Sequence, residues 1–163
     1  MTVVADSSPL ISLAAIGSLD LLPSLYAEIV IPEAVFREVT IVGKGMPGEE
    51  EIGRAAWIKR QSIKDGKKVQ ELLRQARLDN GESEVIVLAG EINATLVLLD
   101  DRQARKYAKK QQLPVSGTLG VLLAAKEHGL ISSIRTALDD LIAAGFHLAS
   151  FEYRNVLRKA GER

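Results

Sequence analysis

The sequence predicts an α/β fold in which a parallel sheet of about four or five strands is covered by helices on both faces. Its strands are short apolar runs without polar alternation, such as Thr95–Leu99, which is typical of strands buried on both faces of a parallel sheet. Segments with helical spacing separate these runs, so strands and helices alternate along the chain. Two runs end in acids, at Asp6 and at Asp100 with Asp101. Ligands of open α/β sheets bind beyond the carboxyl ends of the strands, so these acids are expected to face a site.

The first forty residues are expected to contain two strands and three helices. Ser8 is expected to cap the first helix, with Pro9 in its first position, where the missing N–H costs nothing. Glu38 lies at the edge of the apolar face of the third helix and is therefore half turned toward the core. The expected strands are at 2–6 and 28–31, and the expected helices at 8–16, 18–25 and 32–40.

The middle of the chain is expected to be more polar and more exposed. Its glycine-rich segment, 43–48, lacks the Lys-Ser/Thr ending of a phosphate-binding loop, so we expect a flexible loop there. A turn at 79–84 then leads into a largely apolar helix. The expected elements are helices at 49–56, 67–77 and 85–91 and an extended piece at 57–60.

The last third is expected to add two strands and four helices. The first of these helices carries a basic stripe, because its cations recur at i, i+3, i+4, i+7 and i+8; they are Arg102, Arg105, Lys106, Lys109 and Lys110. The expected strands are at 95–99 and 114–115, and the expected helices at 102–112, 116–126, 132–144 and 149–160. No repeat or linker divides the chain, so residues 1–163 are expected to form a single domain.

Composition excludes several functional classes. The chain has 21 basic and 21 acidic residues, so its bulk charge favours neither a nucleic-acid nor a membrane partner. It has no cysteine and only two histidines, His128 and His147, which excludes thiol catalysis and makes a zinc site implausible. No apolar run approaches the roughly 20 residues that span a bilayer, and no secretory leader is evident, so a cytoplasmic protein without a membrane partner is expected.

Several carboxylates are expected to converge at the carboxyl edge of the sheet. They are Asp6, Glu38, Glu82 and Asp100, with Glu84 and Asp101 as neighbours. Like charges about 4 Å apart repel by a few kcal/mol, so such a cluster needs a cation or shared protons. Carboxylates without His or Cys suit Mg²⁺ or Mn²⁺, which bind through a few carboxylates and the phosphate of a substrate. This donor set therefore indicates metal-assisted phosphoryl chemistry.

Five segments together resemble the PIN domain family, and most closely a PIN-like branch related to VapC-type toxins. The segments are Val-Val-Ala-Asp6-Ser-Ser-Pro, Val-Phe-Arg-Glu38-Val, Leu-Asp-Asn-Gly81-Glu82-Ser-Glu84, Leu-Leu-Asp100-Asp101-Arg-Gln-Ala-Arg and Gly117-Thr-Leu-Gly120. The resemblance implies a three-layer α/β/α sandwich, a divalent-metal ribonuclease centre and frequently a homodimer. By position Asp6 matches the first family acid, Glu38 the second and Asp100 the fourth. Either Glu82 or Glu84 matches the third, and Glu82 is preferred because it lies in the first turn of its helix.

Each of these residues also has a purely structural interpretation. Glu82 follows Asp79 by three residues, as in a capping box. Asp101 has the position of an N-cap for the basic helix, which leaves Asp100 as the better ligand. The basic stripe is most often a solvated helix face, although Arg102, Arg105, Lys106 and Lys109 are the candidates for nucleic-acid contacts.

The resulting hypothesis is a Mg²⁺- or Mn²⁺-dependent ribonuclease that hydrolyses RNA phosphodiester bonds, with Asp6, Glu38, Glu82 and Asp100 as metal-binding and catalytic acids. Ser8 would hold a ligand carboxylate or a water in place. The resemblance extends this to a toxin with an antitoxin protein as partner. Two alternatives stay open, namely a non-catalytic RNA-binding or regulatory module on the same fold and a Mg²⁺-dependent phosphatase or receiver-like domain.

Overall fold

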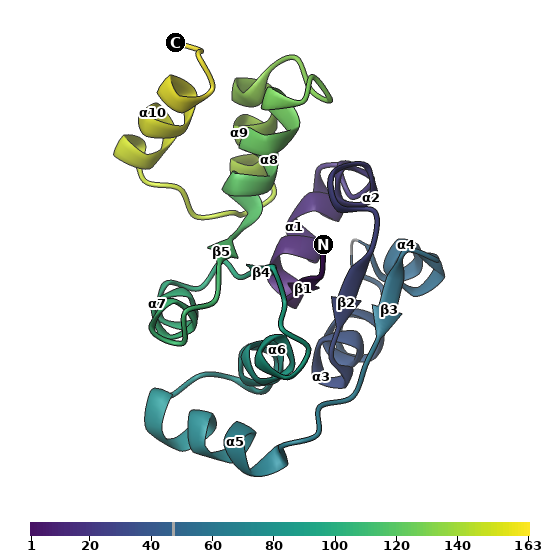
Figure 1. Ribbon diagram of the computed structural model, residues 1–163. Coiled ribbons are helices and arrows are strands. Elements are labelled where there is room, and N and C mark those ends of the chain that lie inside the picture. Colours follow the sequence, from purple (N-terminus) through teal and green to yellow (C-terminus); the bar gives the residue numbers. More distant parts are fainter. Residues whose placement is uncertain (47) are drawn as a thin grey trace.

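The computed structural model describes residues 1–46 and 48–163 and contains one parallel sheet of five strands (Figure 1). The strands are β1 (Val3–Ala5), β2 (Ile29–Ile31), β3 (Ile58–Arg60), β4 (Leu96–Leu98) and β5 (Val115–Ser116). Their order across the sheet is β3-β2-β1-β4-β5, and every neighbouring pair is parallel. The predicted α/β class and the number and direction of the strands are confirmed. The predicted loop at 43–48 includes Pro47, which lies outside the described residues.

Helices lie on both sides of this sheet, as predicted. In Figure 1, α1, α2 and α8 lie above the strands and α3 and α6 below them; α6 packs on β1 and β4 and against α3. The α-helices are α1 (Ser7–Ala15), α2 (Leu21–Tyr26), α3 (Glu33–Arg37), α4 (Glu49–Arg54), α5 (Gly66–Glu71), α6 (Asn80–Glu91), α7 (Arg102–Lys110), α8 (Thr118–Glu127), α9 (Ile134–Ala143) and α10 (Ser150–Lys159). Two π-helical turns, η1 (Glu38–Val42) and η2 (Leu72–Ala76), continue α3 and α5.

The central strands are apolar throughout because both of their faces are covered. All three residues of β1 and of β2 are buried, and the buried apolar side chains around the sheet form one cluster. The edge strand β3 differs, since Lys59 and Arg60 are exposed there. No helix within 1–46 and 48–163 has the length and hydropathy needed to cross a membrane.

Two helix boundaries differ from the prediction in ways that affect the acids. The first helix starts at Ser7, so Asp6 rather than Ser8 is the N-cap residue and Pro9 is the third helical residue. Proline is tolerated throughout the first helical turn, where its N–H has no intrahelical partner, and therefore does not identify the first residue. The Asp6 side chain makes no capping hydrogen bond. The helix predicted at 32–40 becomes π-helical from Glu38 onward, and such turns are frequent at functional sites.

Candidate active site

A cavity of about 500 Å³ opens beside the carboxyl ends of β1 and β4. Its acidic lining residues are Asp6, Asp79, Glu82, Asp100 and Asp101. The rest of the lining comes from α1 along its whole length, from Leu141 of α9 and from the segment between α9 and α10. Two strand ends and one helix start thus bring acids from three distant parts of the sequence to one cavity.

Asp6 is the most buried of these acids. It follows β1, its backbone N–H donates to the carbonyl oxygen of Leu98 at 3.0 Å, and its side chain is only 5% exposed. Burial raises its pKa to about 8, and repulsion from Glu38, Asp79 and Glu82 acts in the same direction. Within the described residues its Oδ1 atom is buried without a hydrogen-bond partner. An unpartnered buried carboxylate oxygen is costly unless it is protonated or binds a cation.

Glu38 presents an oxygen close to Asp6. The Ser7 hydroxyl donates to Glu38 Oε2 at 2.7 Å, whereas Oε1 approaches Gly81 at the start of α6. A Cβ atom on Gly81 would overlap Glu38 Oε1 and would lie 3.2 Å from Asp6 Oδ1. Only glycine leaves room for both oxygens at this point. Burial is the main cause that raises the pKa of Glu38.

Glu82 both caps its helix and lines the cavity. Its backbone N–H donates to Asp79 Oδ1 at 2.8 Å, and its own Oε1 accepts from the Asp79 backbone N–H at 3.1 Å. The predicted capping box is therefore present. Burial raises the pKa of Glu82 to about 7, and neighbouring acids add to this shift. The capping role and a role in the site are compatible, because the capping bond engages only Oε1.

Glu84 points elsewhere. Its Oε1 accepts from the backbone N–H of Ala34 at 3.1 Å, which satisfies a donor in the first turn of α3. Glu84 and Glu38 are both absent from the lining of the acidic cavity, to which Glu82 contributes, but Glu38 approaches Asp6 beside Gly81. This geometry favours Glu82 over Glu84 as the third acid, and that assignment stays a prediction.

Asp100 is held by three donors. Its Oδ1 accepts from the Thr118 backbone N–H at 2.7 Å, and its Oδ2 accepts from the Thr118 hydroxyl at 2.6 Å and from the Ser8 hydroxyl at 3.1 Å. Gly117 is required here, since a Cβ on it would lie 2.6 Å from Asp100 Oδ1. Asp101 instead accepts from the Ala104 backbone N–H at 2.9 Å and caps α7, as predicted.

The basic stripe of α7 begins beside Asp100. A hollow of about 300 Å³ is lined by Asp100, Arg102, Arg105, Lys106, Lys109 and Glu152. Arg105 is partly fixed, because its Nη1 donates to the carbonyl oxygen of Leu99 at 2.9 Å. Of the two histidines, His147 lines the acidic cavity, and His128 Nδ1 lies 2.8 Å from the carbonyl oxygen of Ala124.

Two supporting residues, Ser7 and Thr118, were not predicted. Ser7 orients Glu38, and Thr118 orients Asp100. Thr118 lies within the Gly117-Thr-Leu-Gly120 motif, but the sequence assigns it no role of its own. Both supporting residues are polar and buried at the start of a helix that follows a strand. That position is the signal by which they could have been found.

The donor set fits a hard divalent cation. Asp6 Oδ1 and Glu38 Oε1 both approach Gly81, and oxygen ligands suit Mg²⁺ or Mn²⁺. Among residues 1–46 and 48–163 no group of three or more His, Cys, Asp or Glu side chains is already arranged to hold a metal ion. Mg²⁺ keeps several waters and is often bound through one or two carboxylates, so a pair of converging carboxylates meets its requirement.

Replacing Thr118 by valine is expected to lower activity and stability together. Valine fills the same buried space but removes the hydroxyl that donates to Asp100 Oδ2. Loss of a residue that orients a ligand typically costs about 10- to 100-fold in activity or metal affinity, and loss of a hydrogen bond to a charged group about 1.5–3 kcal/mol. Cleavage rates and thermal melting test this. Thr118→Ser, which keeps the hydroxyl, should retain most of both; equal losses in the two variants would contradict the assignment.

Comparison with known proteins agrees with this architecture. A search of curated proteins finds no significant match. A family model described as DUF3368, a PIN domain, matches residues 2–162, nearly the whole chain. With a five-stranded parallel sheet, helices on both sides and this match, the chain belongs to the PIN domain family.

Proposed function

We propose that this protein is a Mg²⁺- or Mn²⁺-dependent ribonuclease whose site is the acidic cavity beside β1 and β4. PIN domains are generally nucleases, which supports the broader class. The observation that carries the proposal for this chain is the convergence of Asp6 Oδ1 and Glu38 Oε1 at Gly81, where Asp6 Oδ1 is buried without a hydrogen-bond partner among residues 1–46 and 48–163. Burial holds the pKa of both carboxyls above its ordinary value, and a bound cation would offset the cost of ionising them.

Asp6, Glu38, Glu82 and Asp100 are the residues that would hold the ion. When bound, a divalent ion polarises the phosphate and makes a neighbouring water more acidic. The chain contributes orientation: Ser7 holds Glu38, whereas Ser8 and Thr118 hold Asp100. Arg102, Lys106 and Lys109, which are exposed on α7, would bind phosphates of the RNA backbone next to Asp100.

The test is cleavage of an unstructured, fluorescently labelled RNA oligonucleotide and of the matching DNA, with Mg²⁺, with Mn²⁺ and with a chelator. Metal-dependent cleavage of the RNA is the expected result. Glu51→Gln, an exposed acid of α4, is the matched control for charge removal, and Asp6→Asn purified in parallel controls for contaminating nucleases. RNA cleavage that persists in the chelator or in Asp6→Asn would overturn the proposal.

The proposal extends to a toxin with a protein antitoxin. Induced expression in a bacterial host should then arrest growth, and co-expression of the protein encoded beside it should relieve the arrest. Growth that is unaffected by an active enzyme would separate the ribonuclease from the toxin part of the proposal.

A further inference from the structure

A groove continues from the acidic cavity along α7 to α10. The hollow beside Asp100 that α7 lines shares Arg105 and Glu152 with a second hollow of about 290 Å³, whose lining includes Asn155 and Lys159 of α10. The first hollow also shares Asp100 with the acidic cavity. The three depressions therefore adjoin one another at these shared residues.

The outer face of α10 extends the groove. Phe151, Arg154, Asn155 and Arg158 line a further hollow of about 510 Å³, which shares Asn155 with the preceding one. Phe151, Arg154 and Arg158 are spaced at i, i+3 and i+7, so they lie on one face of the helix. The Phe151 side chain is 64% exposed. An exposed ring beside guanidinium groups on the same helix face can stack on an unpaired base while the cations contact phosphates.

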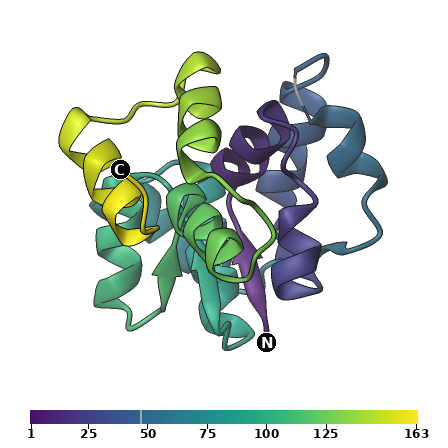
Figure 2. The same ribbon diagram turned by 90° about the horizontal axis from the view of Figure 1, so that it is seen from above.

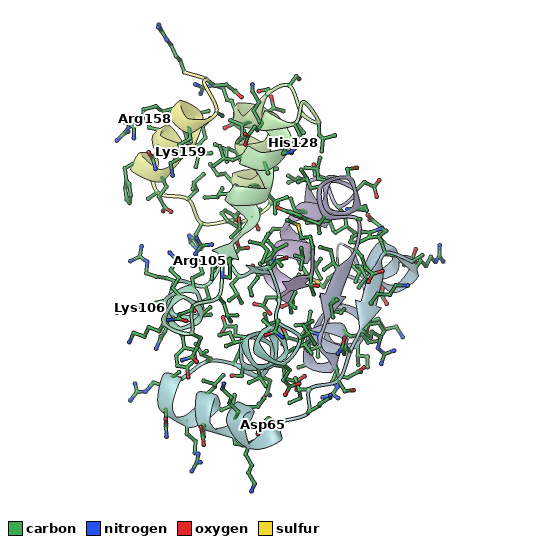
Figure 3. All side chains as sticks on the ribbon, viewed as in Figure 1. Asp65, Arg105, Lys106, His128, Arg158 and Lys159 are labelled. Carbon is green, nitrogen blue, oxygen red and sulfur yellow. The ribbon has the colours of Figure 1, made fainter. Side chains whose placement is uncertain are left out.

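The cations of α7 and α10 lie on the same side of the molecule. Figure 3 shows Arg105 and Lys106 on α7 and Arg158 and Lys159 on α10 along one edge of the view. In the perpendicular view of Figure 2 the C-terminal helix again lies on the side of the molecule that carries α7, and it packs against α8 and α9. The chain as a whole has no net charge, so this basic surface is a local concentration of positive charge.

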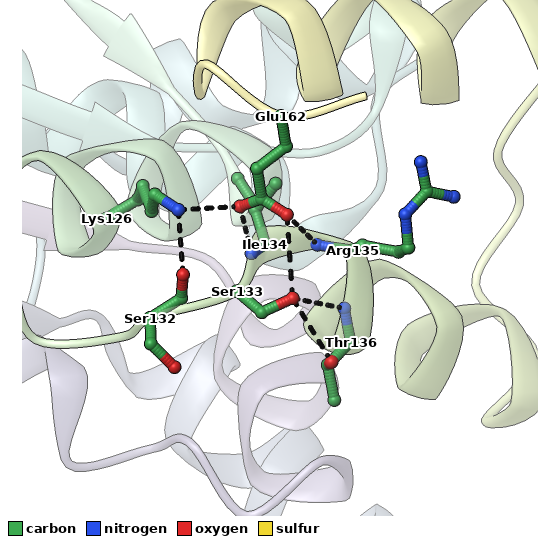
Figure 4. A network of polar contacts seen from close by, with 7 residues as sticks. All are labelled: Lys126, Ser132, Ser133, Ile134, Arg135, Thr136 and Glu162. Atoms are coloured by element: carbon green, nitrogen blue, oxygen red, sulfur yellow. Dashed lines mark hydrogen bonds and ion pairs between the residues drawn. The ribbon is translucent and has the colours of Figure 1, made fainter.

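Hydrogen bonds and an ion pair fix the position of helix α10 near its start and just beyond its end. Near its start, the Tyr153 hydroxyl donates to Asp139 Oδ1 of α9 at 2.7 Å. Beyond its end, Glu162 accepts from Lys126 Nζ at 2.9 Å and from the backbone N–H groups of Ile134 and Arg135 at 2.6 and 3.2 Å (Figure 4). These donors hold the pKa of Glu162 down at about 2. A wall fixed in this way is preorganised and loses little freedom when a ligand binds.

We propose that α10 is the second wall of the substrate groove: a single-stranded RNA segment leaving the acids passes between α7 and α10, with phosphates at Arg105 and Lys159 and an unpaired base stacked on Phe151. The proposal rests on RNA being the substrate of the acidic site. A single strand is favoured because stacking on an exposed ring requires a base that is not paired in a duplex.

A substitution of Glu152 should strengthen RNA binding, whereas the other substitutions on α10 should weaken it. Glu152 lines both hollows between α7 and α10, where its charge would repel a phosphate, and its Oε1 accepts from the Ala149 backbone N–H at 3.2 Å. Glutamine removes the charge but keeps an oxygen for this N–H. Glu152→Gln should therefore bind RNA more tightly, whereas removal of the basic or aromatic side chains of α10 should weaken binding.

The experiment measures binding of a labelled, unstructured RNA oligonucleotide by fluorescence anisotropy over a range of salt concentrations, with chelator present so that metal-dependent cleavage does not interfere. Phe151→Ala should weaken binding roughly 5- to 100-fold, the range for one stacked base. Lys159→Ala should lower the slope of log K against log salt by about 0.7 for one lost phosphate contact to a single strand. Lys67→Ala, which removes an exposed lysine of α5, is the matched control and should bind as wild type.

Unchanged binding in Phe151→Ala, Lys159→Ala and Glu152→Gln, together with weaker binding in Arg102→Ala, would overturn the inference and end the groove at α7. A change in oligomeric state of Phe151→Ala by light scattering, with RNA affinity unchanged, would overturn it as well and identify this face as a self-association surface. If the protein shows no ribonuclease activity, RNA binding can still be measured, because the binding experiment does not depend on cleavage. Failure of the proposed function and failure of this inference are therefore distinguishable.

Discussion

Asp6→Asn is expected to raise the melting temperature of the metal-free protein at pH 9 and to abolish cleavage. Burial raises the pKa of Asp6 from its ordinary value of 3.8 to about 8, so the folded state binds this proton more tightly than the unfolded state does. The contribution of this carboxyl to the free energy of unfolding is therefore fully present below about pH 4 and is lost as the pH rises through 8. Asparagine cannot ionise and avoids this loss. Since about 1 kcal/mol corresponds to roughly 2–4 °C in a chain of this size, an increase of at least a few degrees is expected.

Bound metal should reverse the order of the melting temperatures, so that the wild type becomes more stable than Asp6→Asn. A cation that binds only the folded state stabilises it by about 2.7 kcal/mol at a concentration 100 times its dissociation constant. Mg²⁺ or Mn²⁺ should therefore raise the melting temperature of the wild type, and Asp6→Asn should respond much less. Cleavage by the variant should fall at least about 100-fold, because loss of a residue that merely orients a ligand already costs up to that much.

Thermal melting between pH 4 and 9, with and without metal, measures these effects. Glu51→Gln, which removes an exposed charge, should follow the wild type throughout. An Asp6→Asn protein that is less stable than wild type at pH 9 would show that the charge of Asp6 does not destabilise the fold. A variant that gains as much stability from metal as the wild type would show that Asp6 is not a ligand.

Glu82→Gln is expected to lower cleavage while keeping its helix cap, and Glu84→Gln is expected to leave cleavage unchanged. Glu82 lines the acidic cavity, so its neutralisation should lower cleavage at least about 100-fold, again by comparison with the effect of an orienting residue. The amide oxygen of glutamine can still accept from the Asp79 backbone N–H, so the capping box and the stability are largely kept. Glu84→Gln leaves the acids of the cavity unchanged and should cleave like the wild type.

Glu84→Ala completes this comparison. It leaves the Ala34 backbone N–H without its acceptor, which should cost about 1–3 kcal/mol of stability without lowering the rate of the folded enzyme. Steady-state cleavage and chemical denaturation provide the two readouts. An inactive Glu84→Gln beside an active Glu82→Gln would reverse the assignment of the third acid.

The sheet and two of the helix caps could be predicted from the residues alone. Unbroken apolar runs such as those of β1, β2 and β4 are typical of strands covered on both faces, and acids directly after such strands are expected at the sheet edge. Asp101 and the Asp79–Glu82 pair cap their helices as predicted, because capping depends on residues three positions apart.

Most hydrogen bonds of the acids join residues far apart in the sequence and became evident only in the folded structure. Thr118 reaches Asp100 across 18 residues, Ser8 across 92, and Glu84 reaches Ala34 across 50. The crowding of Asp6 and Glu38 against Gly81 likewise joins three separate segments. Such contacts depend on how strand ends and helix starts pack against one another, and neither hydrophobic periodicity nor local spacing encodes that packing. The acids and Ser8 were therefore predictable from the sequence, whereas Ser7 and Thr118, which also orient the acids, were not.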